Sequence, residues 1–132
     1  MPGFALDTTV VLRLLTGLPE DQAQSARAWL VARRAEQQRP IVSDLVIAEA
    51  YYALCYHYDV PKTIAVRQLR DFLDSGSVTA DGVAVDALTA YSGTGPGLVD
   101  RIINLQHQRL ARQTATFDRD FARLANTVLL RT

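Results

Sequence analysis

The sequence predicts an α/β fold in which a central parallel sheet of four or five strands is flanked by helices on both faces. Short apolar segments alternate along the chain with longer segments whose apolar residues recur at helical spacing. This alternation is typical of parallel strands joined by crossover helices. At 132 residues, the chain is expected to form a single domain over residues 1–132.

The N-terminal part predicts two strands and two helices. The letters FAL form an apolar run that predicts a strand over 3–6, and the apolar run that resumes after Thr9 predicts a helix over 8–16. An amphipathic segment predicts a second helix over 20–38. The letters PIVS then predict a strand over 40–43.

The middle of the chain carries two helix starts with a clear chemical signal. Ser43 is a suitable N-cap for a helix over 44–58, because its hydroxyl can accept from a free amide of the first turn. Pro61 suits the first turn of a helix that reaches Ser75. The letters SVTA that follow predict a short strand over 77–80.

The C-terminal part repeats the alternation with shorter elements. The letters GVAVDALTAY predict a short helix, and the loop SGTGPG leads into a helix over 98–112. The letters QTATF predict a strand over 113–117, and DRDFARL one or two helical turns. The letters TVLL predict a last strand over 127–130.

Composition and charge exclude several classes of protein. The single cysteine, Cys55, excludes a disulfide framework and a cysteine-rich zinc site. The formal net charge is zero, although residues 97–132 carry six arginines against three acids, which permits contact with nucleic acid. No apolar run is long enough to cross a membrane and no signal peptide is recognisable, so we expect a cytoplasmic protein.

Four acidic residues stand at positions where catalytic acids are expected in a parallel sheet. Asp7 interrupts the apolar run FALDTTVV where the first strand ends, and Asp118 follows the strand over 113–117. Glu49 interrupts an apolar helix face, and Asp100 begins a helix after a glycine-rich loop. Each has an ordinary structural explanation alone, such as a helix or turn cap.

Together these four acids predict a metal site. Ligands bind beyond the carboxyl ends of parallel strands, so Asp7, Asp100 and Asp118 could gather at one edge with Glu49. Clustered carboxylates repel one another unless a cation supplies the opposite charge. Carboxylate oxygens without histidine or cysteine suit Mg²⁺ or Mn²⁺ rather than zinc. Such a site can activate water and stabilise a phosphoryl displacement.

Two other phosphate-handling motifs are excluded. The loop SGTGPG lacks the Gly-Lys-Ser/Thr ending of a phosphate-binding loop. A haloacid-dehalogenase site would need a second aspartate two residues after Asp7, where Thr9 stands. The acidic residues therefore remain the leading indication of chemistry.

The chain resembles a PIN domain, specifically the VapC-type toxins of bacterial toxin–antitoxin pairs. The resemblance covers nearly the whole chain and is carried by LDTTVVLRLLTG, VIAEAYYAL, GLVDRIINL and TFDRDF, in the family's order. The chain departs from the family at Thr9, where asparagine is common, and at Arg101 and Asn104, where small residues are usual.

The resemblance implies a Mg²⁺- or Mn²⁺-dependent endoribonuclease that acts on RNA. It assigns the catalytic and metal-binding roles to Asp7, Glu49, Asp100 and Asp118. The residues expected to support this quartet are Thr8, Arg13, Asn104, Thr116 and Asp120.

The resemblance also implies a VapB-like antitoxin that blocks the site, and a homodimer. The tyrosine-rich helix agrees with an interface, because Tyr51, Tyr52, Tyr56 and Tyr58 are too many for one buried stripe. Two alternatives stay open: a catalytically silent PIN-like module that binds RNA or protein, and a nuclease acting on DNA flaps or in ribosomal RNA maturation. The second alternative usually brings additional domains or insertions.

Overall fold

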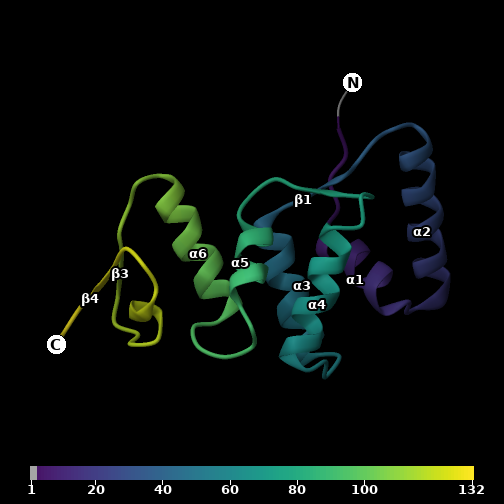
Figure 1. The fold of residues 1–132 in the computed structure, drawn as a ribbon. Coiled ribbons are helices and arrows are strands. Elements are labelled where there is room, and N and C mark those ends of the chain that lie inside the picture. The colour runs from purple at the N-terminus through teal and green to yellow at the C-terminus, as the bar shows by residue number, and fades with distance from the viewer. Residues whose placement is uncertain (1–2) are drawn as a thin grey trace.

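The computed structural model of the protein describes residues 3–132, which form helices and short strands in an α/β order (Figure 1). The helices are α1 (Thr8–Thr16), α2 (Glu20–Ala35), α3 (Asp44–Tyr56), α4 (Lys62–Leu73), α5 (Ala84–Ala90), α6 (Leu98–Arg109) and the 3-10 helix η1 (Phe121–Arg123). The strands are β1 (Ile41–Val42), β2 (Thr79–Ala80), β3 (Thr114–Thr116) and β4 (Thr127–Leu129).

The helix starts agree with the sequence prediction better than the helix ends do. Ser43 caps α3 as expected, since its hydroxyl accepts from the Val46 N–H at 3.3 Å. Helix α2 ends three residues before the predicted end, and Gln37 just beyond it has φ +58°. Helix α6 also ends three residues early, before Ala111 at φ +55°. A left-handed residue cannot continue a right-handed helix, so both helices end before it.

The predicted central sheet of four or five strands is not found in the described part of the chain. Strands β1 and β2 pair in parallel, and the predicted first strand adds only one parallel bridge, between Ala5 and Ile41. Strands β3 and β4 form a second parallel pair, with Ala115 opposite Val128. Figure 1 places this pair beyond α6, far from α1 and α2.

The β3–β4 pair is held in this position by α6. The buried Asn104 side chain donates to the Ala125 carbonyl at 2.7 Å, and the buried Phe121 ring anchors η1. Ladders of two or three residues contribute few hydrogen bonds, so side-chain burial rather than strand pairing decides where the pair docks. Sequence periodicity alone could not predict which partner each short strand would find.

Helix packing provides most of the core. Helix α3 lies at its centre and packs against α1, α4 and α6, while α5 packs between α4 and α6. The largest fully buried side chains include Ile47 and Leu54 of α3, Leu69 of α4 and Leu88 of α5. No helix within residues 3–132 has the length and apolar character needed to span a membrane.

One buried carboxylate, that of Asp44, ties three helices together. It accepts from the Val83 and Ala84 N–H groups at the start of α5, at 3.1 and 2.9 Å. It also accepts from the Gln106 amide of α6 at 2.9 Å. Gly82 passes so close to this carboxylate that a Cβ there would overlap it. Asp44 is therefore a structural acid.

Candidate functional site

Asp7 is the N-cap of α1 rather than a buried charge. Its side chain is exposed, and its Oδ1 accepts from the Val10 N–H at 3.0 Å. The apolar run around it predicted burial, but the chain turns into the helix at this residue and carries the carboxylate to the surface. The cap satisfies one free amide of the first turn and places the acid at the positive end of α1.

Two substitutions separate capping by Asp7 from any role of its charge. We expect Asp7→Asn to leave the free energy of unfolding almost unchanged, because asparagine caps as well as aspartate. We expect Asp7→Ala to lower it by about 1 kcal/mol, because the Val10 N–H loses its acceptor. Urea denaturation monitored by circular dichroism measures both. Equal losses in the two variants would contradict the capping role.

Glu49 and Thr8 connect α3 to the start of α1. The Thr8 hydroxyl donates to Glu49 Oε1 at 3.0 Å, and both residues line an open hollow of about 400 Å³ together with Tyr52 and His57. Glu49 is exposed, as an acid at the edge of an apolar helix face should be. We call this space the Glu49 hollow.

Asp100 lies in the first turn of α6, where its carboxyl is partly buried. Burial raises the pKa of Asp100 above its ordinary value, and the negative charges of Asp118 and Asp120 raise this pKa further. The structure therefore brings Asp118 and Asp120 near enough to Asp100 for their charges to repel its carboxylate. A cation placed among them would relieve that repulsion.

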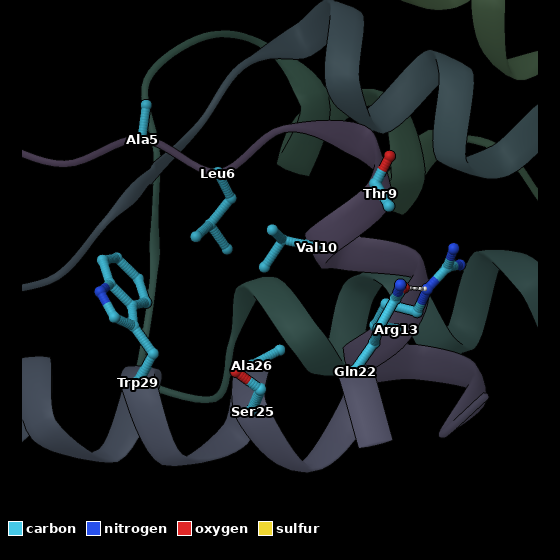
Figure 2. Close-up of a pocket in the computed structure, with 9 residues that line it drawn as sticks. All are labelled: Ala5, Leu6, Thr9, Val10, Arg13, Gln22, Ser25, Ala26 and Trp29. Carbon is cyan, nitrogen blue, oxygen red and sulfur yellow. Dashed lines mark hydrogen bonds between the residues drawn. The ribbon is translucent and has the colours of Figure 1, made fainter. Parts of the chain in front are cut away.

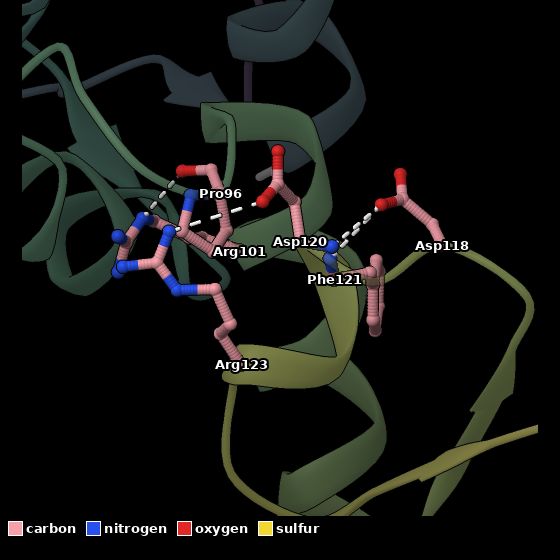
Figure 3. Close-up of polar contacts among 6 residues, drawn as sticks. All are labelled: Pro96, Arg101, Asp118, Asp120, Phe121 and Arg123. Carbon is pink, nitrogen blue, oxygen red and sulfur yellow. Dashed lines mark hydrogen bonds and ion pairs between the residues drawn. The ribbon is translucent and has the colours of Figure 1, made fainter.

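Asp118 and Asp120 lie in the turn between β3 and η1 (Figure 3). Asp118 Oδ1 accepts from the Asp120 N–H at 2.8 Å, and Thr116 Oγ1 accepts from the Asp118 N–H at 2.9 Å. Asp120 also faces Arg123 at 3.8 Å, an exposed pair that contributes little stability. The turn fixes the backbone beside Asp118, and Thr116 supports that turn.

The raised pKa of Asp100 predicts how stability should depend on pH. A carboxyl whose pKa is higher in the folded state stabilises the fold only while protonated, and this contribution disappears as pH rises through the folded pKa. We expect Asp100→Asn to be more stable than wild type at neutral pH, by no more than about 1 kcal/mol because the carboxyl is half exposed.

Chemical denaturation of both proteins at a series of pH values, with EDTA present, measures this difference. The gap should close towards acid pH, where Asp100 of the wild type is protonated as well. A variant that is less stable than wild type at neutral pH would contradict the repulsion.

Two residues expected to support the quartet have other contacts in the structure. Arg13 donates from Nε to Gln22 Oε1 at 2.6 Å and lines an apolar hollow of about 380 Å³ between α1, α2 and the Ala5 segment (Figure 2). None of the four predicted acids lines this hollow. Asn104 is buried, with its amide engaged by Ala125 and Gln108.

A group of aromatic residues beside the acids was not assigned to the site from the sequence. Tyr52 lines the Glu49 hollow and also a second hollow of about 190 Å³, which contains Asp100, Tyr56 and Lys62. We call the second space the Asp100 hollow. Of the four tyrosines within residues 51–58, only Tyr51 is buried, as the sequence suggested for part of the group.

Tyr51 and Tyr91 form the floor of the Asp100 hollow. Their hydroxyl oxygens are 3.2 Å apart, and the rings meet edge to face with centroids 6.1 Å apart. Burial, followed by the hydrogen bond with Tyr91, raises the pKa of Tyr51 far above its ordinary value. The Tyr51 hydroxyl therefore stays protonated at physiological pH.

The four predicted acids fit a hard divalent cation by their chemistry, and they come from separate elements of the fold. Asp7 and Glu49 lie at the start of α1 and on α3, and Asp100 and Asp118 lie at α6 and after β3. Their oxygens are the ligands that Mg²⁺ and Mn²⁺ prefer. Within residues 3–132, however, no three acidic, histidine or cysteine side chains are placed closely enough to hold one ion.

The family comparison covers almost the whole chain. A profile of the PIN domain family matches residues 4–127. The chain belongs to the PIN domain family. PIN domains are single α/β domains, and they are generally nucleases that need divalent metal ions. Comparisons with curated proteins and with solved structures found no match. In this PIN domain, Glu49 and Asp100 line two hollows that share Tyr52.

Proposed function

We infer that the protein is a divalent-metal-dependent endoribonuclease that uses Mg²⁺ or Mn²⁺ to hydrolyse RNA phosphodiester bonds. The observation that carries this inference is the match to the PIN domain family, a family of nucleases. The acidic residues around Tyr52 support it, because they lie in open hollows at the surface where a nucleic acid can reach them. The preferred substrate is unpaired RNA, whose strand can be splayed into a site.

Asp7, Glu49, Asp100 and Asp118 are the residues that would hold the ion. The ion supplies a positive charge that activates water and stabilises the scissile phosphate. Thr8 holds Glu49 through its hydroxyl, and the turn at Thr116 holds Asp118. Binding one ion requires these acids to lie closer together than they do within residues 3–132 as described, so metal should couple α1 and α3 to α6 and the β3–β4 pair.

Cleavage of a fluorescently labelled single-stranded RNA tests this function. We expect cleavage with Mg²⁺ or Mn²⁺ and none with EDTA. A single-stranded DNA of the same sequence should be cleaved far more slowly, and activity on both would favour the broader nuclease alternative.

A second readout does not depend on turnover. Mg²⁺ should raise the melting temperature of the wild type, because a ligand that binds only the folded state stabilises it. The rise should shrink in Asp100→Asn and persist in Asp71→Asn, a control at an exposed aspartate of α4. No cleavage and no metal-dependent rise would favour the catalytically silent binding module.

The VapC-type toxin role is part of this proposal. A small VapB-like antitoxin would lay its C-terminal segment across the acids and present an arginine or lysine in place of the metal's charge. Antitoxin and Mg²⁺ should then compete, and we expect calorimetry to find weaker antitoxin binding at saturating Mg²⁺ than in equal ionic strength of NaCl. A homodimer with two-fold symmetry is the proposed assembly, and light scattering tests it.

A further inference from the structure

The exposed tyrosines of α3 lie beside two of the predicted acids. Tyr52 lines both the Glu49 hollow and the Asp100 hollow, so the two spaces share this residue. Tyr52 and Tyr56 are 57% and 58% exposed, although tyrosine usually buries its ring against a neighbour. Their rings contact each other, with centroids 4.7 Å apart and planes tilted by 39°.

Aromatic faces and a cation occur together at this place. Lys62, at the start of α4, lines the Asp100 hollow with the rings of Tyr52 and Tyr56. Stacking on an aromatic ring is the usual way in which proteins bind an unpaired base, and a nearby lysine suits the phosphate of the same nucleotide. Neither requires a particular sequence, because every base has an aromatic face.

We propose that Tyr52 and Tyr56 form a stacking platform for one unpaired base of the RNA substrate, with Lys62 at its phosphate. This inference rests on the proposed ribonuclease function and adds a determinant of substrate choice. A base stacked on Tyr52 occupies the space that Tyr52 shares with Glu49 in one hollow and with Asp100 in the other, which brings its backbone near these acids. A base inside a duplex cannot reach the platform, so the platform selects single strands and loops.

Binding measured in EDTA tests the platform without cleavage. Fluorescence anisotropy with a labelled single-stranded RNA should give a Kd about tenfold higher for Tyr52→Ala than for wild type, the scale of one lost base stack. Tyr52→Phe should bind like wild type because it keeps the ring. Tyr58→Ala is the matched control, since Tyr58 is exposed but lines neither hollow.

Abasic nucleotides identify the stacked base directly. A series of RNAs, each lacking one base, should contain a position at which the loss weakens wild type about tenfold but leaves Tyr52→Ala unchanged. That non-additivity is expected only if the base and the ring contact each other. Additive losses at every position, or a Tyr52→Phe variant as weak as Tyr52→Ala, would overturn the proposal.

The salt dependence of RNA binding tests the role of Lys62. Lys62→Gln should reduce the slope of log Kd against log salt by about one unit, whereas Arg27→Gln on the exposed face of α2 should not. An equal slope for Lys62→Gln and wild type would remove the phosphate contact from the proposal.

The outcomes separate the platform from its rivals and from the ribonuclease function. If the wild type cleaves RNA with Mg²⁺ and Tyr52→Ala binds RNA as tightly as wild type, the protein has the ribonuclease function and lacks the platform. A protein that shows the abasic coupling in EDTA but never cleaves RNA has the platform and lacks the function. If Tyr52→Ala converts a dimer into a monomer by light scattering, and the abasic RNAs show no coupling with Tyr52, the tyrosines form a protein interface and the proposal is overturned.

Discussion

Replacing Glu49 by glutamine is expected to lower the rate of metal-dependent RNA cleavage at least about a hundredfold, the usual effect of removing one electrostatic group from a reaction centre. The substitution keeps the shape of the side chain and keeps an oxygen that accepts from the Thr8 hydroxyl. Because Glu49 is exposed, the free energy of unfolding should change by less than about 0.5 kcal/mol.

The matched control is Glu36→Gln, at the C-cap of α2. We expect it to cleave RNA at the wild-type rate. Single-turnover cleavage with excess enzyme measures both rates, and thermal melts confirm that both variants are folded. Cleavage by Glu49→Gln at the wild-type rate would remove Glu49 from the site, while a folded Glu36→Gln that is inactive would show that the assay reports overall charge.

Replacing Asp44 by alanine should have the largest effect on stability of any change to a charged residue considered for this chain. The substitution leaves the Val83 and Ala84 N–H groups and the Gln106 amide without their acceptor inside the core. Hydrogen bonds to a charged group are worth about 1.5–3 kcal/mol each and are not additive, so we expect a loss of about 3 kcal/mol.

Urea denaturation measures this loss, with Asp71→Ala on the exposed face of α4 as the control, for which we expect less than about 0.5 kcal/mol. Gly82→Ala should also destabilise the fold, because its Cβ would overlap the Asp44 carboxylate. An Asp44→Ala variant as stable as wild type would mean that water or another acceptor replaces the carboxylate.

The helices could be predicted from the sequence because their signals are local. Ser43 and Pro61 precede α3 and α4, and the apolar spacing that follows each of them is helical. The ends were harder to predict, since Gln37 and Ala111 adopt positive φ without being glycine. The arrangement of the strands could not be predicted correctly. A run as short as TAT indicates a strand but does not specify which strand it pairs with.

Whether an acidic residue could be interpreted correctly from the sequence also depends on whether its signal is local. Glu49 could be singled out because it interrupts an apolar helix face, and Asp100 because it begins a helix after a glycine-rich loop. Asp44 could not, because its partners Val83 and Ala84 are backbone groups about forty residues away. Asp7 was assigned to a buried strand end, although its spacing to Val10 is also that of an N-cap.

The small β3–β4 pair has a consequence for how the molecule opens under stress. It is joined to the rest of the protein through α6 and has a ladder of only three residues, so its amides should exchange with solvent through local opening at low cost. The amides of α4, around the fully buried Leu69, should exchange only through global unfolding. Asp118 lies two residues after the end of β3. On warming, this acid should therefore detach from Asp100 before the helical core melts, and RNA cleavage should fade at a temperature where circular dichroism still reports a folded protein.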